Sequence, residues 1–429
     1  FNTGHVGPMD EEDTAMSNET IEDVSESRAD WEHLDEWVRG KVQDFIQEVL
    51  EEEVTEFFGR RRSERRSAVD GKSGYRNGYG KPRRLTLSSG TIKVRRPRVR
   101  NAEERFESRV LPLFTRRSKK VTELIPDLYL HGLAEGDFDL ALRGLLGDDA
   151  PISASTVSRL KEKWHAELAE WRQRPLDDLE VVYLWVDGVY VKAGLEKDKA
   201  AILVVLAALS DGSKVIVTAV PGYRESTESW SEALRDLKRR GMDCPRLVVG
   251  DGHLGIWGAL RNVYPQVAEQ RCWNHKIVNV LGRIGKRDHV QAKLILCNIP
   301  YAETRKEAEQ LKTRFLAWCS ERGYQAAAET LERDWERMMT FYQFPREHWQ
   351  HLRTTNPVES PFAALRLRTD AAKRYKRVDR ATAVIWKMLM IAEKRFRRLK
   401  APEMMREVYN GAQYVDGLRF HTDTEEAAA

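Results

Sequence analysis

Residues 181–188 read VVYLWVDG, and this stretch decides the fold expected for the second half of the chain. Six consecutive apolar residues, mostly β-branched or aromatic, are typical of a buried strand. Asp187 follows directly and is itself followed by a glycine. Because an unpaired carboxylate is costly at the end of a buried strand, Asp187 either belongs to a turn or lies beside a positive charge.

The same arrangement recurs at residues 247–252, which read LVVGDG and place Asp251 after a second apolar run. Apolar runs at 200–209 and 214–220 predict two more strands, joined by a turn at Asp211-Gly212-Ser213. Helix and strand patterns then alternate. The resulting order, three strands followed by helix, strand, helix, strand and helix, is that of a ribonuclease-H-like domain, in which the strands before the two aspartates are neighbours.

Glu359 is the third acidic residue of interest, at the end of the sequence TTNPVE. Asn356 suits the N-cap of a helix, Pro357 its first position and Glu359 its third, so Glu359 has a purely structural explanation. On a helix that faces the two strands, it would instead join the aspartates in an all-oxygen site, which suits Mg²⁺ or Mn²⁺. Two such ions about 4 Å apart serve phosphodiester chemistry by activating a water or a 3′-hydroxyl.

The composition of the 429 residues allows two or three domains with a substantial core. Hydrophobic residues make up 41% and charged residues 32%, and the net charge is only +4. The charges are segregated, with an acidic segment at 10–56 and basic segments at 60–120 and 366–400. Basic segments on a near-neutral chain indicate contact with a polyanion, although each could equally be a solvated face.

The four cysteines are scattered and nothing near the N-terminus resembles a signal peptide, which predicts reduced thiols in an intracellular protein. No stretch approaches the roughly 18 apolar residues of a membrane span. We therefore expect a cytoplasmic protein without membrane contact.

The N-terminal part of the chain shows three patterns. Helical spacing of apolar residues over 31–58 predicts a helix or helix pair, for self-association or packing. Glycines and short alternating runs over 71–100 predict a β-hairpin with its turn at Ser88-Ser89-Gly90. Three short helical patterns over 118–172 resemble a helix-turn-helix, with an ordinary three-helix bundle as the alternative. The basic residues of the third, DNA-reading helix are Arg159, Lys161 and Lys163.

Residues 286–352 return to a purely helical pattern, which interrupts the α/β region. Its tryptophans, Trp318, Trp335 and Trp349, are expected in the core, with stacking on a flipped base as the alternative. A last helical pattern begins near Pro357 and continues through Arg398. It carries basic residues placed to meet phosphates close to the acidic site. They are Arg366, Arg368, Lys373, Arg374 and Lys376.

Four short motifs connect these observations to a known family. They are Val186-Asp187-Gly188, Gly250-Asp251-Gly252-His253, Arg271-Cys272-Trp273-Asn274-His275-Lys276 and Thr354-Thr355-Asn356-Pro357-Val358-Glu359. With these motifs, and with Arg76-Asn77-Gly78-Tyr79, the chain resembles a Mutator-superfamily transposase of the bacterial insertion-sequence type over about residues 40–400. The resemblance implies a DDE triad of Asp187, Asp251 and Glu359 that binds two Mg²⁺ ions, for which Mn²⁺ can substitute. Ser360-Pro361-Phe362 departs from the family pattern and puts the start of the last helix in doubt.

Cys272 and His275 form a Cys-x-x-His pair between the second and third acids. Two ligands are half of what a structural zinc site needs, and Cys244 or Cys297 could supply a third without the spacing requiring it. We adopt a structural role beside the active site. His275 could otherwise contact DNA, orient a carboxylate or be a satisfied buried histidine.

The predicted fold class is an α/β ribonuclease-H-like catalytic domain with an all-α insertion, preceded by a mainly α region with a small β-hairpin for DNA binding and dimerisation. The predicted segments are 1–29, disordered or foreign to the natural chain; 30–70, a helical dimerisation segment; 71–117, a small basic β-containing module; 118–175, the helix-turn-helix-like domain; 176–285, the first part of the catalytic domain; 286–352, the insertion; 353–400, the final catalytic helices; and 401–429, a C-terminal tail.

The predicted function is that of a nucleoid-associated DNA transposase, which binds the terminal inverted repeats of a transposon, cleaves a strand and transfers it to target DNA. The resemblance implies no covalent enzyme–DNA intermediate, and synapsis of two DNA ends implies a homodimer or a higher oligomer. Two alternatives remain open. One is a ribonuclease-H-fold nuclease that hydrolyses without joining, and the other is a domesticated DNA-binding protein with an inactive acidic site.

Overall fold

The computed structural model describes residues 31–65, 72–134, 137–147, 154–194, 199–222, 224–252 and 254–420. The predictions made for residues 1–29 and for the end of the C-terminal segment, 421–429, lie outside these residues. The chain divides into two compact units, Phe1–Ser118 and Lys119–Ala429, which we call the N-terminal unit and the C-terminal unit. No helix in the described ranges is long and apolar enough to cross a membrane.

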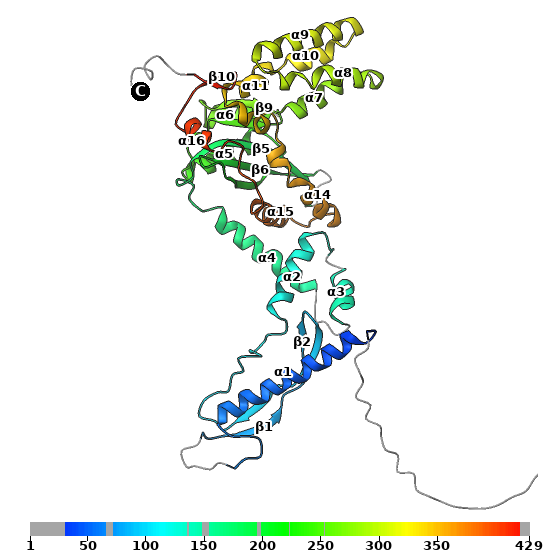
Figure 1. The fold of residues 1–429 in the computed structure, drawn as a ribbon, viewed down its shortest axis with the longest axis vertical. Helices are drawn as coiled ribbons and strands as arrows, with labels where there is room; N and C mark the ends of the chain where they lie inside the picture. The colour runs from blue at the N-terminus through cyan, green and yellow to red at the C-terminus, as the bar shows by residue number, and fades with distance from the viewer. Residues whose placement is uncertain are drawn as a thin grey trace, which may run out of the picture. The chain divides into compact units, whose positions relative to one another are not determined.

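The N-terminal unit packs one long helix against two pairs of strands (Figure 1). Its elements are α1 (Leu34–Phe58), β1 (Tyr75–Tyr79), β2 (Arg83–Leu87), β3 (Gly90–Val94) and β4 (Pro97–Arg100). β2 and β3 form the predicted antiparallel hairpin with its turn at the predicted residues, while β1 pairs with β4. Gln47 on α1 exchanges 2.9 Å hydrogen bonds with the backbone of Arg95, which ties the helix to the end of β3. The segments predicted as 30–70 and 71–117 therefore share one core.

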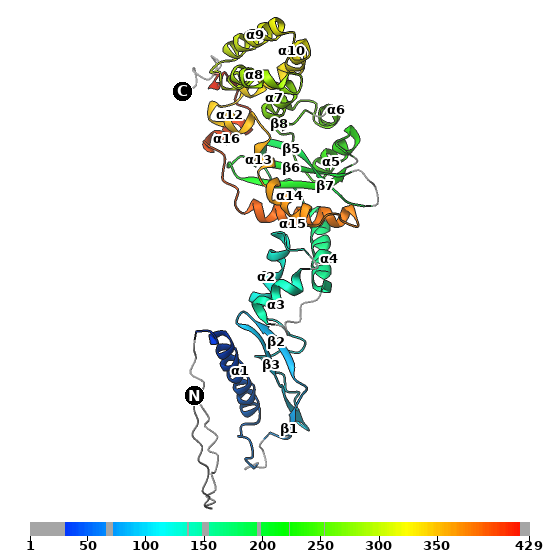
Figure 2. The ribbon, with the colours of Figure 1, turned by 90° about the vertical axis from the view of Figure 1, so that its right-hand side faces the viewer.

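A five-stranded mixed sheet forms the centre of the C-terminal unit (Figures 1 and 2). Its strands are β5 (Val181–Val191), β6 (Ala200–Leu209), β7 (Lys214–Gly222), β8 (Leu247–Gly250) and β9 (Ala268–Arg271). The spatial order is β7-β6-β5-β8-β9, with β5, β6 and β7 antiparallel and β8 and β9 parallel to β5. The predicted succession of strands and helices is confirmed, and so is the prediction that the strands associated with the two aspartates are neighbours.

Alternating side chains of the strands cover the two faces of this sheet, because successive residues of a strand point to opposite sides. On β5, Leu184 and Val186 belong to the core under α5 (Thr227–Arg239) and α6 (Leu254–Val263). Tyr183, Trp185 and Val189 belong to the core on the other face, where α13 (Asn356–Glu359), α15 (Val378–Glu393) and α16 (Glu403–Tyr409) contact the sheet. We call these the α5 face and the α13 face.

The three helices predicted over 118–172 are present as α2 (Lys119–Leu130), α3 (Phe138–Leu146) and α4 (Ala154–Trp171). They share the core of the α13 face instead of forming a core of their own. Trp171 at the end of α4 lies 5.8 Å from Trp386 between ring centroids, and Lys387 forms an ion pair of 2.7 Å with Glu167. Trp386 and Lys387 lie on α15 (Val378–Glu393), whereas Trp171 and Glu167 lie on α4, so α4 and α15 pack side by side.

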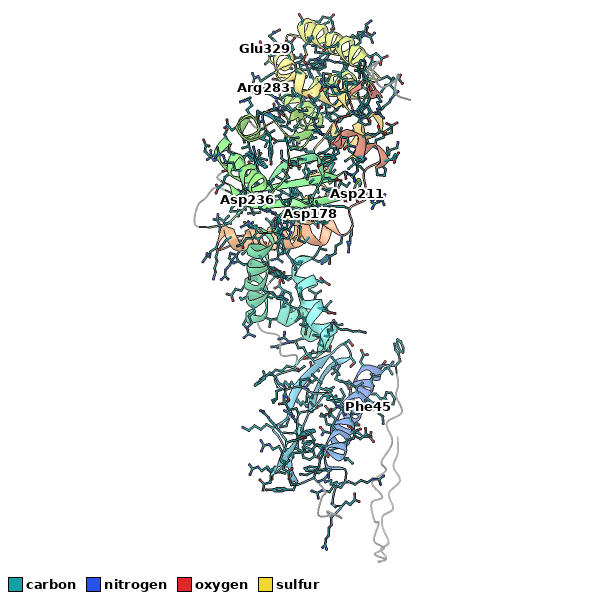
Figure 3. The ribbon with its side chains drawn as sticks, turned by 90° about the vertical axis from the view of Figure 1, so that its left-hand side faces the viewer. Phe45, Asp178, Asp211, Asp236, Arg283 and Glu329 are labelled. Atoms are coloured by element: carbon teal, nitrogen blue, oxygen red, sulfur yellow. The ribbon has the colours of Figure 1, made fainter. Side chains whose placement is uncertain are left out.

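The predicted insertion is helical throughout its described length and lies between α7 (Trp273–Leu281) and α13 (Asn356–Glu359); Arg283 and Glu329 mark this region in Figure 3. Its helices are α8 (His289–Leu296), α9 (Arg305–Arg322), α10 (Gln325–Glu332), α11 (Trp335–Met339) and α12 (Trp349–Leu352), with 3-10 turns η1 (Lys286–Asp288), η2 (Ile299–Tyr301), η3 (Thr340–Gln343) and η4 (Arg346–His348). Trp318, Trp335 and Trp349 are all buried, which confirms that they belong to the core and argues against stacking on a base.

The last part of the chain differs from the prediction in two ways. The helical pattern from Pro357 to Arg398 is divided into α13, α14 (Phe362–Ala371) and α15, because Ser360-Pro361 and the left-handed residue Lys373 (φ 57°) interrupt it. The predicted tail folds as far as residue 420. It forms α16 (Glu403–Tyr409) and a hairpin of β10 (Tyr414–Val415) and β11 (Leu418–Arg419), and it contributes three core side chains. These are Met405, Val408 and Tyr414.

Candidate active site

Asp187 on β5 and Asp251 just after β8 are neighbours, because the two strands are adjacent and parallel. Val186 pairs with Gly250, the last residue of β8, and an aspartate follows each of them in the chain. The prediction that Asp187 ends its strand is wrong, because β5 continues to Val191 while paired with β6. It is β8 that ends, at Gly250, and this leaves the flank of β5 beside Asp187 without a strand partner in the described residues.

The Asp187 carboxylate is half-buried and lies near other acids. Its Oδ1 accepts a hydrogen bond of 2.8 Å from the Gly188 N–H. Burial raises the pKa of Asp187 to about 7 against the effect of this hydrogen bond, and the charges of Asp251, Glu359 and Glu225 raise it further. Asp251 and Glu359 therefore both act on the charge of Asp187, and the structure adds a fourth acid, Glu225.

Glu359 is held by a threonine hydroxyl rather than by the predicted cap. α13 begins at Asn356, and Thr355 precedes it as the N-cap residue without a side-chain cap hydrogen bond. The Thr355 Oγ1 donates to Glu359 Oε1 and lies 3.2 Å from the Cys272 Sγ, while the Thr355 N–H donates to that sulfur at 3.3 Å. Asn356 instead accepts a hydrogen bond of 3.1 Å from Asn274 on α7. These contacts fix α13 to the residues that follow β9.

Cys272 and His275 lie against Glu359. The Cys272 N–H donates to the Gly250 carbonyl at 2.8 Å, which places Cys272 beside Asp251. One side-chain atom each of Cys272, His275 and Glu359 lies within 4.8 Å of the others, so among the described residues Glu359, rather than Cys244 or Cys297, is placed to be the third ligand of a zinc site. A hydrogen bond to Cys272 is the main cause that raises the pKa of His275 to about 9, with the charges of Cys272, Glu359 and Asp251 acting in the same direction against burial.

Two glycines at the site make room for buried charged groups that the sequence did not reveal. A Cβ at position 188 would lie 2.8 Å from the carboxyl carbon of Glu225. A Cβ at position 252, where φ is 98°, would lie 2.8 Å from the Arg271 Nη2 and closer to the rest of the guanidinium. Both Asp-Gly pairs are therefore close approaches between a backbone and a charged side chain. No local sequence pattern predicts these contacts of the two glycines. The sequence shows only that Arg224 and Glu225 directly precede a predicted helix.

Arg271 and the buried Lys276 both form ion pairs with Asp334, at the start of α11. The Lys276 Nζ lies 3.5 Å from Asp334 Oδ2, and burial lowers the pKa of Lys276 to about 8. Asp334 itself has a left-handed backbone, with φ at 69°. This cluster joins the insertion to β9 and α7, next to the loop that carries Asp251.

The predicted DNA-binding residues divide into exposed and buried side chains. Exposed or half-buried are Arg159, Lys161 and Lys163 on α4, Arg366 on α14, and Lys373, Arg374 and Lys376 after it. Arg368 is the exception, because it is only 2% exposed and its Nη1 donates hydrogen bonds of 3.0 Å to the carbonyls of Tyr129 and Leu133. We correct this prediction: Arg368 packs on the Tyr129 ring, 4.0 Å from its centroid, and holds α14 to α2.

A basic pocket unites the two predicted groups. It has a volume of about 490 Å³ and lies between α4 and the segment after α14. Its cationic lining residues come from both and include no acid. They are Lys161, Arg368, Arg374, Lys376, Arg377 and Arg380. Arg377 and Arg380 also form ion pairs, with Asp379 at 2.6 Å and with Glu162 at 3.3 Å.

Comparison with known protein families matches residues 12–397 to the family described as Transposase, Mutator family. The chain belongs to this family. The transposase for insertion sequence element IS6120 of Mycolicibacterium smegmatis is 41% identical to it over 71% of this chain and 94% of that protein. The transposase for insertion sequence element IST2 of Acidithiobacillus ferrooxidans is 37% identical over 65% of this chain and 94% of that protein.

A more distant relative is the transposase for insertion sequence element ISRM5 of Rhizobium meliloti (strain 1021), which is 28% identical over 77% of this chain and 81% of that protein. The match of this Mutator-family transposase to its family contains all three predicted acids and extends over both units. The family resemblance expected from the four motifs is confirmed.

Proposed function

We propose that this Mutator-family transposase carries out DNA transposition by binding terminal inverted repeats, cleaving a DNA strand at the transposon end and joining it to target DNA. The observation that carries the proposal is the placement of Asp187 on β5 beside Asp251, which directly follows the adjacent parallel strand β8. The charge of Glu359 acts on the Asp187 carboxylate as well. The insertion-sequence transposases among the relatives support the same class of activity.

The donor set fits hard divalent cations. Its members are carboxylate oxygens, the ligands that Mg²⁺ and Mn²⁺ prefer. The acids are also crowded enough that burial and mutual repulsion raise the pKa of Asp187 to about 7, a repulsion that a cation would relieve. Asp187, Asp251 and Glu359 would hold two Mg²⁺ ions, with Mn²⁺ as a substitute. Such ions, when bound, supply activation of a water or a 3′-hydroxyl and stabilisation of the leaving oxygen.

The neighbouring residues hold the carboxylates in place before DNA arrives. The Thr355 hydroxyl bonds Glu359 and connects it to Cys272. His275, with its pKa near 9, is protonated at neutral pH, and its Nδ1 lies 3.9 Å from Glu359 Oε1. Groups that orient a ligand in this way raise its effectiveness, because less reorganisation is needed when the metal and substrate bind. We propose this orienting role for Cys272 and His275 in place of zinc binding.

We also propose that the C-terminal unit has a ribonuclease-H-like catalytic fold with an all-α insertion. Three antiparallel strands in succession, followed by two strands added parallel to the first, support this assignment. The acids occupy the positions that the fold would require, with one on the first strand, one after the fourth and one on a helix that follows the insertion.

For DNA, we propose that the basic pocket takes a backbone phosphate. Arg374 donates a hydrogen bond of 3.0 Å to the Gly194 carbonyl, which places this side of the pocket beyond the end of β5. Gly194 lies seven residues beyond Asp187, so at roughly 3.3 Å per residue the two are at most about 23 Å apart along the chain. Arg159, Lys163, Arg366 and Lys373 extend the same contacts outside the pocket.

The proposal is tested on the three acids separately. Asp187→Asn, Asp251→Asn and Glu359→Gln should each abolish Mg²⁺-dependent cleavage of transposon-end DNA, a loss of at least about 10³-fold, while end binding persists. The matched control is Asp178→Asn, because Asp178 is exposed (Figure 3) and its variant should cleave normally. Full cleavage by any one of the three variants would contradict the assignment.

The same assay separates the alternatives. Joining of a pre-cleaved 3′ end to a target by the wild-type protein distinguishes a transposase from a nuclease that only hydrolyses. A wild-type protein that binds end DNA but neither nicks nor joins it in Mn²⁺ would indicate an inactive DNA-binding protein.

A further inference from the structure

We propose that Glu225 is a fourth carboxylate of the metal site and reaches it from the α5 face, opposite Glu359. The inference rests on the proposed function, because it assigns another ligand to the same two ions. Asp187, Asp251 and Glu359 would hold the two ions of the proposed function, and Glu359 would reach them from the α13 face. Glu225 supplies an acid for the other side.

Glu225 is a buried acid placed directly against the residue after Asp187. It is 8% exposed. Its carboxyl carbon lies 2.8 Å from where a Cβ of residue 188 would be, and its Oε1 lies closer still. Only a glycine leaves room for this carboxylate, so Gly188 has a purpose other than forming a turn, which β5 does not contain at this point.

The strand pattern shows how acids from opposite faces can meet. Gly188 is two residues beyond Val186, and Val186 points to the α5 face, so the space above Gly188 belongs to that face. Asp187 points the other way, toward α13, which contacts β5. Because β8 ends at Gly250, no strand of the described sheet separates the two faces beside Asp187, and carboxylates from both sides can share a cation there.

The segment around Glu225 is positioned by close backbone contacts. A Cβ at Gly255 on α6 would lie 2.8 Å from the carbonyl carbon of Ser226 and closer still to the carbonyl oxygen of Glu225. Arg224 just before it has a left-handed backbone (φ 54°), a conformation that costs energy for a residue with a side chain. Ser226 then caps α5 through its hydroxyl, which accepts from the Ser229 N–H at 3.2 Å. This arrangement holds the carboxylate of Glu225 in one place.

The electrostatic neighbours of Glu225 agree with its placement. The Tyr190 hydroxyl, two residues beyond Gly188 on β5, is hydrogen-bonded to Glu225. Burial raises the pKa of Tyr190, and the charges of Glu225, Asp251 and Asp187 raise it further, so the three acids act on the same hydroxyl. A tyrosine hydroxyl that donates to a carboxylate orients that carboxylate, as groups around a metal ligand do.

The experiment is a Mn²⁺ titration of the full-length protein, with free Mn²⁺ followed by electron paramagnetic resonance. The wild-type protein should bind two ions. Glu225→Gln should weaken one of them by at least about tenfold. Gly188→Ala should also weaken one ion, because its methyl group displaces the Glu225 carboxylate although Glu225 itself is unchanged. Glu228→Gln, which makes the same change at an exposed position of α5, is the control and should bind both ions normally.

Thermal unfolding separates a ligand from a structural residue. If Glu225 is a ligand, Glu225→Gln should leave the melting temperature in EDTA unchanged or higher, because one of several crowded acids is removed, and the rise caused by Mn²⁺ should shrink. A lower melting temperature in EDTA with normal Mn²⁺ binding would overturn the proposal. Asp251→Asn separates the Glu225 assignment from the proposed function. If Asp251→Asn weakens Mn²⁺ binding and Glu225→Gln does not, only the Glu225 assignment fails. If neither does, the metal site of the proposed function fails as well.

Discussion

Asp187 is a carboxylate whose surroundings favour its neutral form. All six residues before it in β5 are buried, and it lies beside Asp251 with Glu359 and Glu225 near enough to act on its charge. In the unfolded chain it ionises near pH 4, whereas in the folded, metal-free protein its pKa is about 7. Above pH 4 the folded, metal-free protein therefore keeps a proton on Asp187 that the unfolded chain has released. As a result, the free energy of unfolding is reduced above pH 4.

This predicts a pH-dependent effect of Asp187→Asn in EDTA. Between pH 4 and pH 7 the folded state binds more protons at residue 187 than the unfolded state, so the contribution of Asp187 to stability falls as the pH rises and stays low above pH 7. Asp187→Asn should raise the free energy of unfolding at pH 8 by on the order of 2 kcal/mol and by little near pH 4. Urea denaturation at the two pH values measures this. Asp178→Asn is the exposed control, and an Asp187→Asn protein less stable than wild type at pH 8 would refute the prediction.

The charge of Asp334, the residue directly before α11, connects the insertion to β9 and α7. Asp334 is the common partner of Arg271, which ends β9, and of Lys276 on α7. All three side chains are nearly buried. Removing one partner from such a group leaves uncompensated charge in the interior, which costs far more than the loss of a surface ion pair.

Asp334→Asn is therefore expected to destabilise the C-terminal unit by about 3 kcal/mol. Asparagine tolerates the left-handed backbone at this position, so the change removes the charge without adding backbone strain. Glu336→Gln provides the comparison, because the Arg305–Glu336 pair of 2.6 Å involves an exposed carboxylate. Its variant should change the free energy of unfolding by less than about 1 kcal/mol. If chemical denaturation shows that both substitutions lower the free energy of unfolding equally, burial does not determine the size of the effect.

At the scale of the whole molecule, the surface proposed to bind DNA is formed by segments that are far apart in the sequence. α4 and the segment after α14 are more than 190 residues apart in the sequence, yet both line the basic pocket. The helices α2, α3 and α4 pack into the core of this unit, so DNA held by α4 would be held by the same body that carries the acids. Dimerisation through α1 stays a prediction, as does DNA binding by the β-strands of the N-terminal unit.

A double substitution tests the electrostatic part of DNA binding. Lys373→Ala with Lys376→Ala removes two exposed cations, of which Lys376 lines the pocket and Lys373 lies outside it. If each contacts a phosphate, the slope of log K against log salt should become shallower by about 2 in magnitude, at roughly 0.9 per phosphate contact. Lys293→Ala with Lys306→Ala makes the same charge change at exposed positions of the insertion. The same slope in the wild-type protein and in the Lys373→Ala, Lys376→Ala double variant would show that these lysines contact no phosphate.

Several features of the structure could not be predicted from local sequence patterns. Nothing near Arg368 distinguishes it from Arg366, because burial depends on α2, which is more than 200 residues away in the chain. The folded segment at 403–419 has weak local patterns and is stabilised by contacts such as that of Arg246, whose Nη2 donates to the Tyr409 carbonyl at 2.6 Å. Thr355 was visible only as part of a motif, whereas its role depends on the nearby sulfur of Cys272.

The sequence by itself determined the succession of strands and helices, the helical nature of the insertion, the family and the three candidate acids. These follow from apolar periodicity, turn residues and short motifs, all of which are properties of adjacent residues. Only the tertiary structure decided that Asp187 lies within a strand and beside the end of another, that Arg368 is buried, and that Glu225 joins the acids. Each of these depends on strand register and on packing between distant segments, because the position of a carboxylate in space is set by the elements around it and not by its neighbours in the chain.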